Sequence, residues 1–139
     1  MLRQFNTILL IRAARPGLHE FTAEVREFVT RSGMREGLLT IFCRHTSASL
    51  ILQENAAPAA RRDLEAYFAR VAPEGGPYEH DDEGPDDMPA HLRTALTATQ
   101  LSIPVQDRRL VLGTWQGIFL FEHRRSTPER QIALHLIGE

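Results

Sequence analysis

The sequence predicts an α+β fold of about seven strands and three helices, formed by a single domain over residues 1–139. A length of 139 residues suits one domain, and 42% hydrophobic with 24% charged residues is ordinary for a folded chain. Short apolar, β-branched runs occur near both ends of the sequence, and apolar residues spaced by three and four concentrate between them. The first pattern indicates strands and the second indicates amphipathic helices.

Seven runs have the length and composition of strands, and turn residues separate several of them. They cover residues 5–13, 38–44, 48–53, 101–106, 110–112, 118–123 and 131–137. We expect turns at Pro16-Gly17, at 107–109 and at Thr127-Pro128. The glycines on either side of Trp115 mark a bulge or the close approach of a ligand or a second backbone, although a lone tryptophan is more often part of the core.

Three helices are expected. The first ends at Gly33 and has a core stripe formed by Leu18, Phe21, Val25, Phe28 and Val29. The second follows the N-cap Asn55 and ends before Pro73, and the third begins at the N-cap Asp87. The core face of the third helix is predicted to contain Met88, Leu92, Ala95 and Leu96.

The charge composition limits the possible chemistry. All 16 basic residues are arginine, so the chain has no lysine for a Schiff base, a general base or a phosphate-binding P-loop. Residues 74–87 contain seven acids and no arginine, which gives this segment a charge of −7 and the remainder +5. An anionic ligand must therefore be bound by guanidinium groups, backbone N–H groups or hydroxyls.

The cysteine count and the hydropathy pattern indicate the compartment. The single cysteine, Cys43, cannot form an internal disulfide, which suits a reducing cytoplasm. No apolar run approaches the ~20 residues of a membrane-spanning helix. We therefore expect a cytoplasmic protein without a membrane partner.

Two function classes lack their sequence signatures. The chain has no G-x-S-x-G motif of the kind found in serine hydrolases, and its arginines are too dispersed to suggest a nucleic-acid partner.

The histidines offer the most specific chemistry. Four of the six, at positions 45, 80, 91 and 123, lie at predicted element boundaries, where a scaffold can position binding residues. His80 and His91 bracket the acidic segment, and a helix places Asp87 and His91 on one face. A carboxylate beside an imidazole fixes its tautomer and raises its basicity. The pattern fits a divalent-metal site, and the simpler alternative is a solvated acidic loop.

Two further segments have polar groups suited to ligand binding. His45-Thr46-Ser47 interrupts two predicted strands directly after Arg44, so that hydroxyls, a guanidinium and backbone N–H groups come together. Such groups form a seat for phosphate or carboxylate, and the alternative is a polar bulge. Glu54 follows the next strand and is placed to act as a base, with Asn55 beside it as a helix cap.

Four motifs together resemble the YjbQ-like family of small proteins, some of whose members have been assigned thiamine-phosphate synthase activity. They are His45-Thr46-Ser47-Ala48-Ser49-Leu50, Glu54-Asn55-Ala56, Asp86-Asp87-Met88-Pro89-Ala90-His91 and Gly113-Thr114-Trp115-Gln116-Gly117-Ile118. The resemblance covers nearly the whole chain, in the family's order and spacing, and is strongest from His45 to Arg124.

The resemblance implies a fold and a polar, metal-binding pocket. The fold is a two-sheet β-sandwich of about seven strands with two to three helices, assembled as a homotrimer around a threefold axis. The implied metal ligands are His45, His80 and His91. The implied carboxylates are Glu54 and Asp87, as catalytic or supporting groups, together with Glu122. The implied substrate contacts are Thr46, Ser47, Gln116 and Arg124.

The implied activity is that of a metal-dependent enzyme acting on a small phosphorylated metabolite. In a thiamine-phosphate synthase-like reaction, a pyrimidine diphosphate loses pyrophosphate while a thiazole phosphate nitrogen is alkylated. Three imidazoles leave an open position on a zinc-like ion and favour it over magnesium, which prefers oxygen ligands. Such a site also fits hydrolase or lyase chemistry. The alternative is a trimeric metal- or metabolite-binding protein without catalytic turnover.

The chain departs from the family pattern in two places. Many relatives have an aspartate where this chain has Ala57, and the segment Asp81-Asp82-Glu83 is more acidic than expected. If the missing carboxylate binds metal or substrate, activity here is altered unless the neighbouring acids substitute for it.

Overall fold

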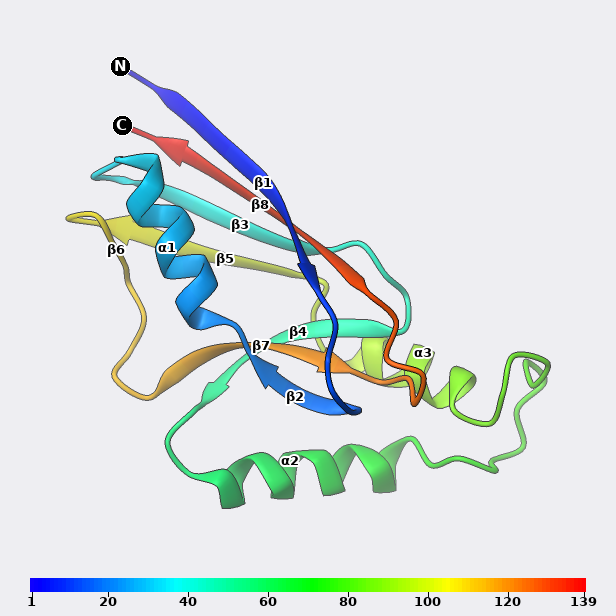
Figure 1. The fold of residues 1–139 in the computed structure, drawn as a ribbon. Helices are drawn as coiled ribbons and strands as arrows, with labels where there is room; N and C mark the ends of the chain where they lie inside the picture. Colours follow the sequence, from blue (N-terminus) through cyan, green and yellow to red (C-terminus); the bar gives the residue numbers. More distant parts are fainter.

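The computed structural model describes residues 1–139 and contains eight strands and three helices (Figure 1). The strands are β1 (Arg3–Ile11), β2 (Gly17–Glu20), β3 (Gly37–Cys43), β4 (Ala48–Glu54), β5 (Gln100–Gln106), β6 (Arg109–Leu110), β7 (Gln116–Glu122) and β8 (Arg130–Gly138). The helices are α1 (Thr22–Ser32), α2 (Pro58–Val71) and α3 (Asp87–Leu96).

The strands form two antiparallel sheets. The larger sheet has the order β1-β8-β3-β5-β6, and the smaller has the order β2-β7-β4. In Figure 1 the larger sheet and α1 lie above the smaller sheet, and α2 lies below it. The predicted α+β class and two-sheet arrangement are confirmed, with one strand more than the approximate count of seven.

The main core lies between the larger sheet, α1 and the smaller sheet. Ile132, Leu134 and Leu136 of β8 point into it, because alternate residues of a strand face one side of the sheet. The smaller sheet is covered on both faces, since α2 packs Phe68 edge-on against Phe121 with ring centroids 5.2 Å apart. Coverage of both faces explains why β7 is apolar at consecutive positions from Ile118 to Phe121.

The outer face of the larger sheet remains open and partly apolar. Its exposed or half-buried apolar residues are Ile8, Leu10, Leu38, Phe42, Ala133 and Ile137. These residues alternate with the core residues of β1, β3 and β8, so they share one surface.

The helix predictions need three corrections. Leu18 lies in β2 instead of extending α1, because residues 17–20 pair with β7. Ala57, not Asn55, precedes α2, since the Asn55 side chain donates to Glu20 instead of capping the helix. On the apolar face predicted for α3, Met88 and Leu92 are half-buried, whereas Ala95 and Leu96 are exposed, Leu96 by 58%. The buried residues of α3 are instead Asp87, Pro89 and Ala90.

The ends of the chain lie side by side, because β1 and β8 pair along their whole lengths (Figure 1). The Met1 ammonium lies 3.2 Å from the Glu139 carboxylate. None of the three helices has the length and apolar character needed to cross a bilayer.

Candidate metal centre

Arg124 holds the acidic segment against the body of the protein. It follows β7, and its three guanidinium nitrogens all bind the segment: Nε donates to Asp86 Oδ2 (3.0 Å), Nη1 to Asp87 Oδ1 (2.6 Å) and Nη2 to the Glu83 carbonyl (3.0 Å). The side chains of Arg124 and Asp87 are 23% and 4% exposed, so this ion pair is shielded from solvent. The contacts fix the start of α3 relative to β7.

Asp86 takes the N-cap position predicted for Asp87, although its carboxylate makes no capping hydrogen bond. The carboxylate accepts instead from the Arg125 backbone N–H at 2.9 Å and from Arg124. Burial works to raise the pKa of Asp86, but these two hydrogen bonds outweigh it and hold the pKa below its ordinary value. The carboxylate therefore stays ionised and keeps Arg124 in place.

Two imidazoles converge on the remaining oxygen of Asp87. His80 Nε2 lies 2.8 Å and His91 Nε2 lies 3.1 Å from Asp87 Oδ2. The two rings are 5.5 Å apart between centroids. Glu83 joins the group, with Oε2 3.4 Å from His80 Nε2. One atom from each of these four residues lies within 4.8 Å of the others.

The hydrogen bonds of His91 define the state of its ring. Nδ1 lies 3.0 Å from the Thr46 carbonyl, which only accepts, so Nδ1 carries a proton. In the neutral ring Nε2 then carries a lone pair, and it lies 3.1 Å from Asp87 Oδ2. Two acceptors at this distance need a cation, either a proton or a metal ion, to hold them together. A carbonyl behind an imidazole is also the usual support of a metal-ligating histidine.

Two imidazoles and two carboxylates form a donor set that could hold a zinc-like ion. Tetrahedral zinc with nitrogen and oxygen ligands at about 2.0–2.1 Å places neighbouring ligand atoms about 3.3 Å apart. The distances from Asp87 Oδ2 to the Nε2 atoms of His80 and His91, 2.8 and 3.1 Å, are shorter than that value, so the three side chains would separate slightly to take up an ion. Two imidazoles with carboxylates favour a transition metal over magnesium.

The carboxylates around His80 set its protonation. Its hydrogen bond to Asp87 is the largest influence and raises its pKa, against a smaller opposing effect of desolvation. Burial works to raise the pKa of Asp87, but the hydrogen bond from His80 and the charges of His91 and Arg124 bring it below its ordinary value. The cluster therefore attracts cations at neutral pH.

His45 lies outside this group, unlike in the three-histidine set implied by the family resemblance. Its Nε2 accepts a hydrogen bond from the Gln131 backbone N–H at 2.7 Å, so that lone pair is already used. Burial, followed by the nearby charge of Arg130, lowers the pKa of His45. Its segment nevertheless borders the site, since the next residue supplies the carbonyl that binds His91.

Thr46 borders the cluster through its carbonyl, Ser47 follows it in the chain, and the hydroxyls of both are free. Their backbone carbonyls are used, by His91 Nδ1 and by Arg130 Nη2 at 3.0 Å, but neither hydroxyl forms a hydrogen bond within the chain. Thr46 is exposed and Ser47 half-buried. These two hydroxyls are therefore open to a ligand.

A buried ion pair supports this end of the smaller sheet. Glu122 and Arg130 are 1% and 3% exposed, and Arg130 Nε donates to Glu122 Oε1 at 2.8 Å while Nη2 donates to Oε2. Glu122 Oε2 also accepts from the Arg124 backbone N–H at 3.0 Å. Glu122 is therefore a positioning group behind Arg124, not a ligand of the cluster.

Glu54 and Gln116 lie at the opposite end of the smaller sheet. The register pairs Ala48 with Glu122 and Glu54 with Gln116, so six residue steps, or about 20 Å of strand, separate the two ends. Gln116 Oε1 accepts from the Gly113 N–H at 2.8 Å. Glu54 Oε2 is buried and has no hydrogen-bond partner. The residues predicted to form one site thus fall into two groups within the chain.

Two other side chains of reactive types, Cys43 and His123, are made unreactive by burial. Burial raises the pKa of the Cys43 thiol to about 11, so it is not a nucleophile at neutral pH. His123 is 3% exposed, and its Nε2 lies 2.9 Å from Ser49 Oγ. Burial, followed by the charge of Arg93, lowers the pKa of His123 to about 3, so this ring is neutral and structural.

The spacing of the sequence identifies His80, Asp87 and His91 but not all of their partners. Glu83 enters the cluster because the loop folds back on itself, and loop conformation has no periodic signal in the sequence. The role of Asp86 was also missed, and the only available indication was its place beside Asp87.

Trp115 is exposed, contrary to its interpretation as a core residue. It is 63% exposed and lies just before β7, at the Glu54 end of the smaller sheet. At the neighbouring Gly117, side chains make the close approach, since an added Cβ would lie 2.6 Å from Glu20 Oε2.

Comparison with known proteins identifies the family. Residues 6–139 match the family model described as UPF0047 protein YjbQ-like. The chain is 50% identical over 138 residues to a UPF0047 protein of Synechocystis, covering 99% of this chain and 94% of that one. It is 42% identical over 136 residues to the UPF0047 protein YjbQ of Escherichia coli O157:H7, covering 97% and 99%.

Solved structures show the same fold. A YbjQ-like protein of unknown function from Sulfolobus solfataricus superposes with a TM-score of 0.93 at 26% identity, with all of both chains covered. A hypothetical protein from Aeropyrum pernix gives a TM-score of 0.88 at 29% identity, covering 97% of this chain and 99% of that one. From its sequence match and its fold, the chain belongs to the YjbQ-like UPF0047 family.

Proposed function

We propose that this protein is a metal-dependent enzyme acting on a small phosphorylated metabolite. The observation that carries the proposal is the convergence of two imidazole Nε2 atoms on one oxygen of Asp87, with Glu83 beside them. A divalent ion bound there supplies positive charge that stabilises a departing phosphate group or polarises a phosphoryl oxygen. The imidazole content favours a zinc-like ion.

The chain's own residues have distinct tasks in this proposal. His91 presents Nε2 because the Thr46 carbonyl holds Nδ1, and Asp87 is oriented by Arg124. The free hydroxyls of Thr46 and Ser47 donate to phosphate oxygens of the substrate. Arg124 acts as a positioning residue, because all three of its guanidinium nitrogens already bind the loop.

A finer proposal is a thiamine-phosphate synthase-like reaction. A bond forms between the thiazole nitrogen and the pyrimidine methylene carbon, while the bond from that carbon to the diphosphate oxygen breaks and pyrophosphate leaves. The motifs shared with the family support this reaction. The donor set of His80, His91 and carboxylates fits hydrolase or lyase chemistry as well, because pyrophosphate is usually accompanied by magnesium with oxygen ligands.

We also propose that a homotrimer completes the site. Glu54 and Gln116 lie about 20 Å along the sheet from the cluster, so a neighbouring subunit is needed to bring them to the same substrate. The open apolar face of the larger sheet and the unpartnered Glu54 Oε2 support an assembly in which further contacts exist.

Elemental analysis of the untagged protein after dialysis tests the metal site. We expect one zinc-like ion per chain in the wild type and none in the H80A/H91A double variant. His19→Ala is the matched control, because His19 lies on β2 and its Nε2 contacts the Arg15 carbonyl, away from the cluster, so this variant should keep its metal. A wild type without metal, or a double variant that retains it, would contradict the proposal.

The alternative function is metal or metabolite binding without turnover, favoured by the charge of −7 on the segment that carries the site. Glu54→Gln separates the two. An enzyme should keep its metal and lose turnover in a screen of phosphorylated substrates for released phosphate or pyrophosphate. A binding protein should show no turnover in either form.

A further inference from the structure

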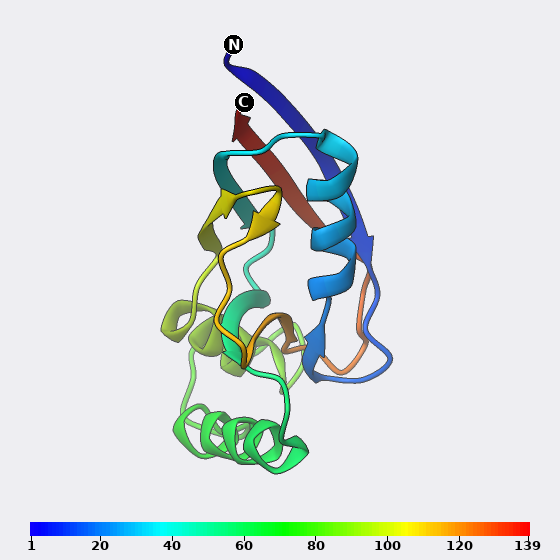
Figure 2. The ribbon, with the colours of Figure 1, turned by 90° about the vertical axis from the view of Figure 1, so that its left-hand side faces the viewer.

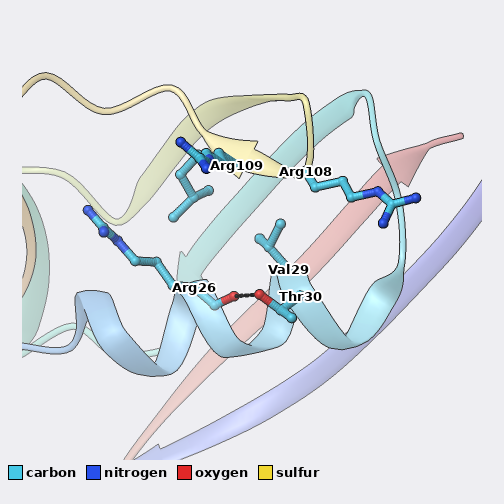
Figure 3. Close-up of a pocket in the computed structure, with 6 residues that line it drawn as sticks. Arg26, Val29, Thr30, Arg108 and Arg109 are labelled. Carbon is cyan, nitrogen blue, oxygen red and sulfur yellow. Dashed lines mark hydrogen bonds between the residues drawn. The ribbon is translucent and has the colours of Figure 1, made fainter.

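A second polar pocket lies between α1 and the β5–β6 hairpin, apart from the metal cluster. It has a volume of about 290 Å³. Val29 and Leu110 supply its apolar surface, and Arg26, Arg108 and Arg109 supply its charge. Figure 3 shows the guanidinium groups of Arg26 and Arg109 extending to the same side, while Arg108 extends to the other end.

None of the three arginines has a partner in the chain. Their guanidinium groups form no hydrogen bond and no ion pair, whereas those of Arg124 and Arg130 are engaged by carboxylates. Arg26 also borders the adjoining pocket with Glu20 and Glu24, yet neither carboxylate forms an ion pair with it. Three unpaired cations around one concavity repel each other, and an anion between them removes that repulsion.

The turn that carries two of the arginines is conformationally unusual. Asp107 and Arg108 have φ values of 49° and 67°, the left-handed conformation that a two-residue hairpin turn requires at both positions. Glycine or asparagine ordinarily occupies such positions, and arginine there is under backbone strain. The one acid of the turn, Asp107, is exposed and lies 3.5 Å from Arg35. The two arginines of the turn outnumber it, so the turn has a net positive charge.

The position of the pocket separates it from the metal cluster. In Figures 1 and 2, β6 and α1 lie on the side of the molecule near the termini, whereas α3 and the loop before it lie at the opposite end. The two groups also have opposite charge: three arginines line the pocket, and the loop with the cluster holds seven acids. An anion bound between the arginines does not meet the metal ligands.

We propose that this pocket binds a small organic phosphate at a site separate from the metal centre. Its phosphate lies between Arg26 and Arg109, whose planar guanidinium groups donate paired hydrogen bonds to phosphate oxygens. Its apolar portion rests mainly on the half-buried Leu110, since Val29 is only 2% exposed. The inference does not depend on the proposed function, because it concerns residues that the metal site does not use.

Calorimetric titration with inorganic pyrophosphate tests the charged part of the site. The full chain is first freed of metal with a chelator, which is then removed, so that the His80 cluster cannot bind the probe through an ion. We expect one pyrophosphate per chain, and about tenfold weaker binding for Arg26→Gln and for Arg109→Gln, each of which removes a charge-assisted contact. Arg108→Gly keeps the turn, because glycine prefers its positive φ, and should weaken binding less, because the Arg108 guanidinium extends to the other end of the pocket.

Two controls make the result decisive. Arg31→Gln removes an exposed charge from the same helix outside the pocket and should bind as the wild type does. The H80A/H91A variant should also bind normally, even if the proposed metal function is wrong. No binding to the wild type at millimolar pyrophosphate, or equal weakening by Arg31→Gln, would overturn the proposal. Citrate binding as tightly as pyrophosphate would overturn the preference for phosphate.

Discussion

Asp87 links the catalytic proposal to the stability of the fold. One oxygen accepts from Arg124 and the other faces two imidazoles, so a single buried side chain joins β7, the acidic loop and α3. Loss of the carboxylate would leave Arg124 without its shortest contact and the two rings without their common partner. Variants at Asp87 therefore mix effects on metal with effects on folding, and the histidine variants test the metal site more cleanly.

His123 gives a prediction about pH. Its pKa of about 3 in the fold is below the unfolded value near 6.5, so the unfolded chain binds the proton first as the pH falls. Its stabilising contribution is complete above about pH 6.5 and is lost between that pH and about 3, at up to about 1.4 kcal/mol per pH unit. In His123→Gln the free energy of unfolding should fall less steeply over this range, measured by urea titration at several pH values.

Ser49→Ala is the matched control for this prediction. It removes the hydroxyl 2.9 Å from His123 Nε2 but keeps the buried ring, so it should lower stability and retain the wild-type pH slope. Equal slopes in the wild type and in His123→Gln would show that this ring is not protonated on unfolding.

At the scale of elements, the glycine that ends α1 stabilises the fold by a predictable amount. Gly33 follows the helix with φ of 70°, and its N–H donates to the Thr30 carbonyl. An added Cβ would meet no atom within 4 Å, so Gly33→Ala changes only the backbone energy. We expect a loss of about 1 kcal/mol in the free energy of unfolding by urea. Gly113→Ala has no positive φ to overcome and should change stability by less; an equal loss in both would contradict the argument.

The elements also show how far local sequence signals extend. Gly33 was predictable as a helix end because left-handed termini favour glycine, and the strands of the larger sheet follow from their apolar alternation. Leu18 continues the apolar spacing of α1, so the sequence gives no sign of β2. This strand forms because it pairs with β7, about 100 residues away in the chain. Asn55 is a residue type that often caps helices, but here its side chain donates a hydrogen bond to Glu20 instead.

In the candidate site too, local sequence predicts some contacts and the tertiary fold determines the others. His91 and Asp87 share a helical face, which their spacing predicts. His80 and Glu83 reach them through a loop, and Arg124 comes from a strand end 37 residues beyond Asp87. Only the fold brings such segments together, and the paired strands also place Glu54 away from the cluster.

At the scale of the whole molecule, the open face of the larger sheet predicts assembly. Phe42 is 44% exposed on this face, among the apolar residues of β1, β3 and β8. If the proposed homotrimer buries this face, light scattering should give about three times the chain mass of 15.7 kDa for the wild type and a value near one chain for Phe42→Asp. Tyr67→Asp places the same charge at an exposed site on α2 and should leave the assembly intact. A monomeric wild type would contradict the trimer.

The pairing of β1 with β8 places both ends of this chain at one corner, where the Met1 ammonium lies 3.2 Å from the Glu139 side-chain carboxylate. A short peptide joining the two would close the backbone into a ring without disturbing either sheet. Opening that ring between Gly75 and Gly76 would create new ends in the acidic loop. In such a circular permutant the residues that bear His80 become a terminal arm, so the acidic loop is held at one end only while both sheets keep their strands.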